Sequence, residues 1–381
     1  MLINRTIFPS IKKILSGEPK IIVIYGPRQA GKTVLLTELI KSEKRKILFF
    51  QGDDLLTQDT FSSPRLDHLE STVGDAEIIV IDGAQKIDNI GQSLKLLYDN
   101  RPRFILATGS SSFHLANKLA ESMTGRATFF TLYPLAISEL PHEEIRFGLD
   151  KKLSELLIFG MYPKIHTINS QEQKEQYLLD IINTYLYQDI LSFEGIRKPK
   201  KIIDLLQLLA FKIGNEVSIQ ELSQNLSLSK IVVEKYLDVL EKMFIVINIR
   251  GFSRNLRKEI SKTSKYYFTD LGLRNAIIRN FNPLKLRADT GALFENFGIL
   301  ERIKLLSNTK KYANWYFWRT YDQKEIDLIE ERDGKINAFE FKFGGGKIPG
   351  ATQKEFLKTY PQSGLKLINR ENLGFFLNFP V

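Results

Sequence analysis

The chain has 381 residues, which is too long for one compact core and predicts two or three domains. It contains no cysteine, its four histidines have no ligand-like spacing, and no apolar run reaches about 18 residues; disulfides, thiolate zinc sites and a membrane-spanning helix are therefore excluded. The net charge of +10 lies mainly in residues 251–381, where 23 Lys and Arg stand against 14 Asp and Glu.

Residues 19–140 alternate short apolar segments with helical patterns. The apolar segments are KIIVIYG, KILFFQGDD, EIIVIDG and RFILATGSS. Strands at this rhythm predict an α/β fold with a parallel sheet covered by helices on both faces. We expect this first domain to span residues 1–148.

The strongest motif follows the first of these strands. It fits G-x-x-x-x-G-K-[ST] and opens a helix, which is the context that a phosphate-binding loop requires. Backbone N–H groups and the helix N-terminus would surround phosphate oxygens, Lys32 would reach the β- and γ-phosphates, and Thr33 would ligate Mg²⁺. The pattern predicts ATP or GTP binding with Mg²⁺, ATP being the cofactor we assign. The loop residues are Gly26, Pro27, Arg28, Gln29, Ala30, Gly31, Lys32, Thr33 and Val34.

Polar residues end two later strands of the same region. Asp82 follows the buried run Ile78–Ile81, where a carboxylate would hold Mg²⁺ through water. Thr108, Ser110 and Ser111 end the strand FILATG, where a hydroxyl could sense the γ-phosphate. Asp82 could instead cap a turn before Gly83, and Ser110 and Ser111 could simply form a serine-rich turn.

The residue after Asp82 is Gly83, which cannot polarise an attacking water. General-base help is typically worth about 10²–10⁴-fold in rate, so we expect weak ATP hydrolysis. Gln85 could orient the water instead, and Asp53 and Asp54 are possible substitutes, although the sequence favours each as a turn residue.

Residues 149–250 have a helical period. We expect a helical linker or lid over 149–200 and a winged helix-turn-helix over 201–250, in which three helices precede the strand FIVINIRGF. A DNA-reading helix should be net basic, but residues 229–243 carry three Lys against three acidic residues. Contact with a partner protein, or packing between domains, is the favoured role of this helix.

Residues 251–381 are predicted to form a separate basic α/β domain with a hairpin around Asp333-Gly334. A two-residue turn there places Asp327 opposite Glu340, and Glu325 opposite Lys342. Like charges across a ladder are destabilising, so this pair calls for a cation. Two carboxylates with Lys342 beside them form the D…E-x-K arrangement of metal-dependent nucleases, and Glu295 could complete the ligands. The alternative is a solvated face on which Lys342 pairs with Glu325.

Several long motifs occur in an order that resembles prokaryotic AAA-type ATPases with a C-terminal domain of unknown function 4143. They are GPRQAGKTVLL, ATGSSS, ESMTGRA, YPLAISEL, KYYFTDLGLRNAI, GALFENFGILE and FWRTYDQKEIDLIEERDGKINAFEFK. The resemblance implies an AAA-type nucleotide-binding core, a winged helix and a restriction-endonuclease-like C-terminal domain. It makes Lys32, Thr33 and Asp82 nucleotide and Mg²⁺ residues, and Arg126 a phosphate-sensing arginine. The family usually has Asp-Glu where this chain has Asp82-Gly83.

The sequence therefore predicts an ATP-binding protein whose nucleotide state controls a nuclease-like domain facing nucleic acid. The alternative is a non-catalytic nucleotide switch that binds partner proteins and whose two catalytic centres are degenerate. AAA-type ATPases often share arginines between subunits, so an oligomer is compatible with the sequence. The lack of cysteine and of an N-terminal secretory signal favours a cytoplasmic protein without a membrane partner.

Overall fold

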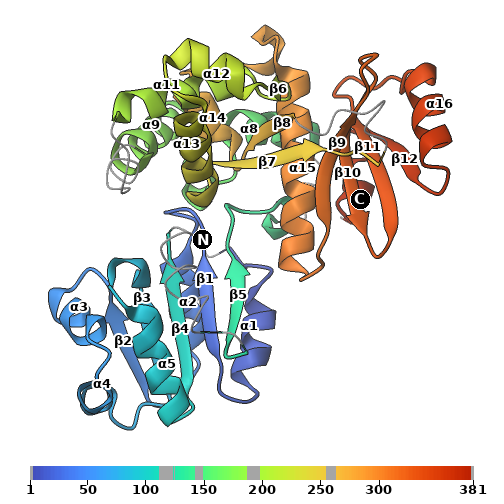
Figure 1. The fold of residues 1–381 in the computed structure, drawn as a ribbon. Coiled ribbons are helices and arrows are strands. Elements are labelled where there is room, and N and C mark those ends of the chain that lie inside the picture. Colours follow the sequence, from blue (N-terminus) through green and yellow to red (C-terminus); the bar gives the residue numbers. More distant parts are fainter. Residues whose placement is uncertain are drawn as a thin grey trace. The chain divides into compact units, whose positions relative to one another are not determined.

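The computed structural model describes residues 3–110, 123, 125–141, 149–186, 198–254 and 263–378. Its chain divides into two compact units (Figure 1). The first contains residues 1–135 and 242–244, and the second contains 136–241 and 245–381. Ser111, one of the predicted phosphate-sensing hydroxyls, lies outside the described residues.

The first unit is built on a five-stranded sheet in which every pairing is parallel. The strand order β2-β3-β4-β1-β5 puts β1 between β4 and β5. The strands are β1 (Ile21–Tyr25), β2 (Ile47–Gln51), β3 (Ile78–Asp82), β4 (Phe104–Gly109) and β5 (Ala127–Thr131). The predicted parallel sheet is confirmed.

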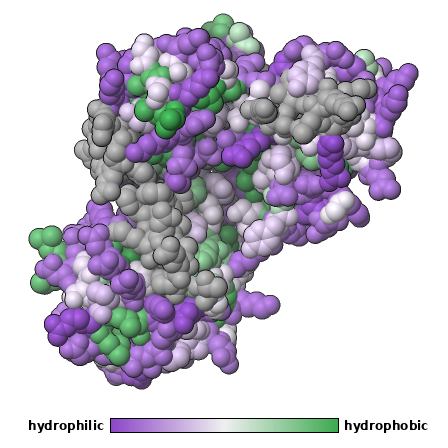
Figure 2. Space-filling view, in the orientation of Figure 1, coloured by the Kyte–Doolittle hydropathy of each residue, from purple (hydrophilic) through white to green (hydrophobic). Residues whose placement is uncertain are grey.

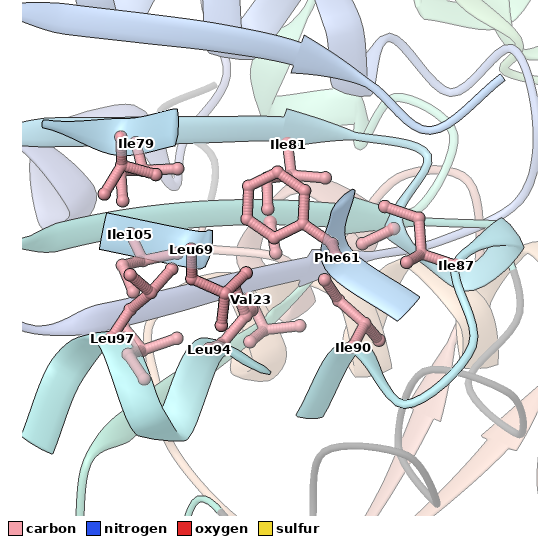
Figure 3. Packing of buried hydrophobic residues seen from close by; sticks show 14 of the residues in the cluster. Val23, Phe61, Leu69, Ile79, Ile81, Ile87, Ile90, Leu94, Leu97 and Ile105 are labelled. Atoms are coloured by element: carbon pink, nitrogen blue, oxygen red, sulfur yellow. The ribbon is translucent and has the colours of Figure 1, made fainter. Parts of the chain in front are cut away.

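Helices pack on both faces of this sheet, which explains why its strands are continuous apolar runs. Alternate residues of β1, Ile22 and Ile24, pack toward α1 and α2, whereas Ile21 and Val23 pack with α3, α4 and α5 (Figure 3). These helices are α1 (Phe8–Leu15), α2 (Lys32–Ile40), α3 (Leu55–Ser62), α4 (Leu66–Val73) and α5 (Ile90–Asn100), with the short η1 (Ala84–Lys86) after β3.

The second unit combines helices with a seven-stranded mixed sheet of order β12-β11-β10-β9-β7-β8-β6. Its strands are β6 (Glu216–Val217), β7 (Val246–Gly251), β8 (Ser264–Phe268), β9 (Asn314–Arg319), β10 (Glu325–Arg332), β11 (Lys335–Phe341) and β12 (Gly364–Ile368). Its helices are η2 (Ile137–Glu139), α8 (Leu149–Phe159), η3 (Pro163–Thr167), α9 (Gln171–Asp180), η4 (Ile181–Leu186), α11 (Pro199–Phe211), α12 (Ile219–Leu226), α13 (Lys230–Lys242), α14 (Leu271–Ile277), η5 (Leu284–Leu286), α15 (Thr290–Asn308), α16 (Gly350–Thr359) and α17 (Leu373–Phe376).

The predicted domain boundary at residue 251 falls within a single sheet of the structure. That position is the last residue of β7, and β7 pairs with β9 in parallel through Arg250↔Tyr316 and Gly251↔Phe317. The strands that follow α13 and the strands of the C-terminal part therefore share one sheet. Local patterns identify the separate strands, but pairing across about 65 residues of sequence is not encoded in them.

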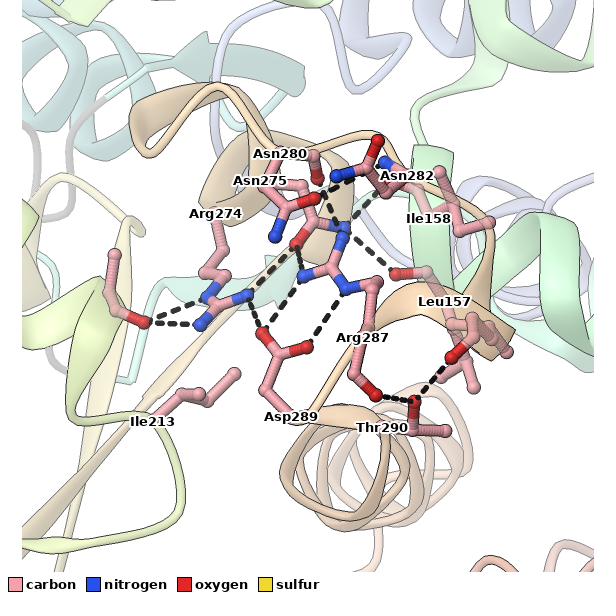
Figure 4. Close-up of polar contacts among 12 residues, drawn as sticks. Leu157, Ile158, Ile213, Arg274, Asn275, Asn280, Asn282, Arg287, Asp289 and Thr290 are labelled. Carbon is pink, nitrogen blue, oxygen red and sulfur yellow. Dashed lines mark hydrogen bonds and ion pairs between the residues drawn. The ribbon is translucent and has the colours of Figure 1, made fainter.

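A buried polar cluster connects four segments of the second unit (Figure 4). Asp289 accepts hydrogen bonds from Arg274 and Arg287, and both arginines also bond to Asn275. Asn275 donates to the carbonyls of Leu157 and Ile158 in α8, while Arg274 donates to a carbonyl of α11. The cluster thus fixes α8, α11 and α14 to the start of α15.

Hydrophilic residues cover most of the face shown in Figure 2. None of the described helices is long and apolar enough to cross a lipid bilayer.

Candidate functional sites

The predicted phosphate loop connects β1 to α2. At Gly26 a Cβ atom would lie 2.0 Å from the carbonyl oxygen of Leu132, so only glycine fits there. Gly31 has a φ of 96°, a left-handed conformation that favours glycine. The Lys32 ammonium donates to the carbonyls of Gly26 and Pro27, at 2.8 and 2.7 Å, and so lies over the loop. Within the motif Ala30 is buried and Val34 is exposed on α2.

Arg5 fixes this loop and is a residue that the sequence analysis missed. Its guanidinium donates to the carbonyls of Ala30 and Tyr133, each at 2.6 Å. The contacts span 25 and 128 residues of sequence, so no local motif marks Arg5.

Thr33 and Asp82, the predicted Mg²⁺ residues, lie together at the carboxyl edge of the sheet. The Thr33 hydroxyl lies 2.5 Å from one Asp82 oxygen, and the Thr108 hydroxyl donates to the other. Thr108 also accepts from the Gly83 N–H at 3.0 Å. Asp82 therefore faces the phosphate loop, and Thr108 holds this carboxylate.

Gly83 has a left-handed backbone, with a φ of 82°. A Cβ atom there would have no heavy atom closer than 3.9 Å, so the position has space but strains any other residue. Gln85 and Ser110 are brought together, since the Ser110 N–H donates to the Gln85 side-chain oxygen at 3.3 Å. Both lie at the edge of the sheet where Asp82 ends β3.

Asp53 and Asp54, which were considered as groups that could polarise the attacking water, lie at turn positions. Asp53 forms an ion pair with Lys86. Asp54 caps α3 by accepting from the Thr57 N–H at 3.0 Å.

Arg126 lies at the opposite edge of the sheet from the phosphate loop. Its carbonyl accepts from the N–H of Ile21, the first residue of β1, whereas the loop begins after Tyr25, the last. Five strand residues separate these edges by about 16 Å. The Arg126 guanidinium pairs with Asp99 at 2.6 Å. The structure therefore does not bring Arg126 to the phosphate loop of its own chain, and a role in sensing phosphate stays a prediction.

The second candidate site lies on the β10–β11 hairpin, whose predicted register is confirmed. Leu328 pairs with Phe339 and Ile329 with Ala338, which places Asp327 opposite Glu340. Asp327 accepts from the Phe341 N–H at 2.8 Å. Asp327 is 8% exposed and Glu340 is 6% exposed, so neither lies on the solvated face of the alternative interpretation.

Lys342 and Glu325 do not face each other as expected. Lys342 pairs with Glu340 at 2.8 Å, and Glu325 pairs with Arg319 at 3.1 Å and with Lys265 at 2.5 Å. The reason is local geometry. β11 ends at Phe341, and the pairing of β10 with β9 shifts register between Ile326 and Ile329, so simple alternation fails at this end of the hairpin.

Two further residues, Lys265 and Tyr267 of β8, enter this site. Lys265 lies 3.3 Å from Glu295 of α15 and 3.9 Å from Asp327, in addition to its contact with Glu325. The Tyr267 hydroxyl donates to Glu295 at 2.6 Å. Glu295, the predicted third metal ligand, is thus directed to Lys265 and Tyr267. We call Glu295, Glu325, Asp327 and Glu340 the acidic site.

Burial and mutual repulsion raise the pKa of two carboxylates of the acidic site, although lysines lie beside them. Burial, with the nearby Glu295, raises the pKa of Asp327. Burial and Asp327 raise the pKa of Glu340 to about 7. One Glu340 oxygen is buried with no hydrogen-bond partner among the described residues. For Lys265, burial alone would lower the pKa, but Glu295, Asp327 and Glu325 outweigh it and hold the pKa well above its usual value.

Asp327 and Glu340 are the residues that would hold a divalent cation at this hairpin. No three His, Asp or Glu side chains among the described residues form a complete metal cage. Mg²⁺, however, is commonly bound by one or two carboxylates with several waters. The unpartnered Glu340 oxygen and the facing Asp327 supply two carboxylates.

Comparisons with known proteins agree with this description of the first unit. Residues 18–141 match the family described as AAA domain, and the parallel sheet carrying the phosphate loop defines an AAA-type ATP-binding protein. Residues 290–372 match domain of unknown function 4143, and residues 150–284 match domain of unknown function 8612. The first unit thus has the AAA-type ATPase fold, and the AAA and 4143 matches lie where the motifs of the sequence resembled those families.

Two relatives are similar in sequence to most of the chain. The uncharacterized protein Rv2008c of Mycobacterium tuberculosis is 27% identical over 337 residues, which cover 87% of this chain and 72% of that protein. An uncharacterized protein of Haemophilus influenzae is 26% identical over 361 residues, which cover 87% and 84%. The solved structure of the Walker-type ATPase paby2304 of Pyrococcus abyssi aligns with a TM-score of 0.50 at 16% identity, over 73% of this chain and 96% of that one. This likeness shows a shared fold.

Proposed function

We propose that ATP bound at the Gly26–Thr33 loop controls a metal-dependent site that cleaves nucleic acid, formed by Asp327, Glu340 and Lys342. The observation that carries the proposal is the buried pair Asp327 and Glu340, with one Glu340 oxygen lacking a hydrogen-bond partner among the described residues. Burying a carboxylate without compensation is costly, and a cation between the two would remove that cost.

The residues around this pair fit phosphodiester hydrolysis. A bound Mg²⁺ polarises a phosphoryl oxygen and lowers the pKa of its water. The Phe341 N–H fixes the Asp327 carboxylate. Partial burial would lower the Lys342 pKa, but Glu340 outweighs it and raises that pKa, so Lys342 stays protonated at neutral pH. Its ammonium would therefore stabilise the charge that develops on the phosphate and would not accept a proton.

The nucleotide site would use the groups assembled on the first unit. Lys32 would exchange the Gly26 and Pro27 carbonyls for the β- and γ-phosphates, and Thr33 and Asp82 would hold Mg²⁺. Gln85 would orient the attacking water. Because Gly83 supplies no acid, we expect slow hydrolysis.

The partner in this proposal is nucleic acid, drawn by the charge of residues 251–381. Their 23 Lys and Arg exceed their 14 Asp and Glu, an excess that favours phosphate backbones. We place the protein in the cytoplasm, a reducing compartment in which proteins rarely rely on disulfide bonds, because the chain contains no cysteine.

Cleavage of plasmid and single-stranded DNA by the full-length chain, with Mg²⁺ or Mn²⁺, tests the proposal. The Asp327→Asn variant should lose activity by about 100-fold or more, since a metal ligand is removed. The matched control is Asp333→Asn, because Asp333 is 84% exposed at the hairpin turn. Equal cleavage by wild type and Asp327→Asn, or no cleavage under any condition, would refute the nuclease function.

The second candidate function is a nucleotide switch that binds a partner protein and turns over little ATP. Gly83 favours it, because the chain lacks the acid that normally follows Asp82. On α13 the charges balance and Ile231 is 78% exposed, which suits a protein contact better than DNA. An ordinary ATPase rate that Lys32→Ala abolishes would exclude the switch.

A further inference from the structure

The acidic site surrounds a buried ammonium group. Lys265 is 1% exposed, and its Nζ atom lies 2.5 Å from Glu325, 3.3 Å from Glu295 and 3.9 Å from Asp327. Glu295 comes from α15, and the other two carboxylates come from β10. Three carboxylates from two elements therefore converge on one lysine.

The ammonium approaches Asp327 from the side opposite to Glu340. In the sheet order β11-β10-β9-β7-β8, the strand of Asp327 lies between the strand of Glu340 and that of Lys265. The two oxygens of Asp327 have different partners. Its Oδ1 atom faces Lys265, and its Oδ2 atom accepts a hydrogen bond from the Phe341 N–H of β11.

Such a group of carboxylates is what a second metal ion would need. Two-metal sites hold their ions about 3.5–4 Å apart, commonly with a shared carboxylate between them. Here Asp327 has the position of the shared carboxylate, and the second position contains a lysine. A lysine ammonium is a compact point charge that can satisfy several carboxylates.

We infer that Lys265 takes the place of a second divalent cation, so that the site binds one metal ion, at Asp327 and Glu340. Lys265 is then a positioning residue, which neutralises Glu295 and Glu325 and holds Asp327 toward the single metal ion. This inference rests on the proposed metal-dependent function.

Calorimetric titration of the nucleotide-free, full-length chain with Mn²⁺ tests it. Wild type should bind one ion, and Asp327→Asn should bind none. Lys265→Met should bind a second ion, or bind the first about 10-fold more tightly, because three carboxylates lose their cation. The matched control is Lys304→Met, which removes another buried lysine paired with a glutamate, Glu301. It should bind Mn²⁺ as wild type does.

The outcomes separate this inference from the proposed function. If wild type binds two ions, or if Lys265→Met matches a one-ion wild type in number and affinity, the inference fails and the proposed function stands. Binding by Lys265→Met alone would show that Lys265 keeps metal out of the site, and it would contradict both the proposed function and the one-ion site. No binding by either protein would overturn both.

Folding of Lys265→Met is checked by thermal unfolding. Should that variant not fold, Lys265→Met/Glu325→Gln removes one negative charge together with the lysine and takes its place in the titration. Two ions bound by wild type would refute the inference whether or not the variants fold.

Discussion

The Thr33 hydroxyl lies 2.5 Å from the Asp82 carboxylate, although 49 residues of sequence separate them. Thr33 lies in the first turn of α2, which follows Gly31, and Asp82 ends β3, the strand next to β4. The contact joins the two groups that would hold the Mg²⁺ of a bound nucleotide. The phosphate loop and the strand that ends at Asp82 therefore belong to one candidate nucleotide site.

Lys32→Ala should weaken ATP binding about 10- to 100-fold, because charge-assisted hydrogen bonds contribute about 1.5–3 kcal/mol. Calorimetric titration with ATP and Mg²⁺ measures this loss. Lys41→Ala, at the end of the same helix and paired with Glu38, is the control and should bind as wild type does. Equal ATP affinities for wild type, Lys32→Ala and Lys41→Ala would show that Lys32 does not contribute to nucleotide binding.

Gly83→Glu should raise ATP turnover about 10-fold or more over Gly83→Gln, because only the acid can polarise water. Both variants carry the same strain at a φ of 82°, which we expect to lower the free energy of unfolding by about 1–3 kcal/mol. Steady-state phosphate release and urea unfolding measure the two effects. Identical turnover in the pair would mean that a side chain at position 83 does not reach the water.

Glu340 should make the protein less stable as pH rises from about 4.5 to about 7 in metal-free buffer. Its pKa is raised to about 7 in the folded protein, from 4.5, so the folded state holds a proton that the unfolded state has released. The Glu340→Gln variant should lose this dependence, which we expect to be on the order of 1–3 kcal/mol. Unfolding by urea at several pH values measures it. The same pH dependence in wild type and Glu340→Gln would contradict the assignment, and Glu371→Gln is an exposed control.

Asp289→Asn should lower the free energy of unfolding by about 2–4 kcal/mol, since it leaves Arg274 and Arg287 without their shared carboxylate (Figure 4). The arginines overcome the effect of burial and lower the Asp289 pKa to about 2. Its stabilisation is therefore present above pH 4 and is lost as pH falls toward 2. Urea unfolding at neutral pH checks the first effect, with Asp333→Asn as control. A loss below about 0.5 kcal/mol would show that the cluster does not stabilise the unit.

Local patterns were sufficient to predict the phosphate loop, the parallel sheet and the register of the β10–β11 hairpin. Gly26, Gly31 and Lys32 lie within one short sequence motif, and the Asp333-Gly334 turn alone fixes which residues face each other. Asp82 could be placed because parallel strands end at one edge of the sheet.

Contacts that depend on non-local pairing could not be predicted. Lys265 reaches the acidic site only because β7 joins β9 and brings β8 into the same sheet. Arg126 is displaced from the phosphate loop because β5 begins at the edge where β1 begins. Neither β5 nor β8 was among the strands predicted from the sequence, and the pairings that position them join residues far apart in the chain.

The rate of DNA cleavage with and without ATP tests the central claim most directly, in wild type and in Lys32→Ala. Coupling between two sites is typically worth about 1–3 kcal/mol, so ATP should change the wild-type rate by about 5- to 150-fold. ATP should leave the Lys32→Ala rate unchanged. A wild-type rate that is the same with and without ATP, or an equal ATP response in Lys32→Ala, would contradict control of the acidic site by the nucleotide.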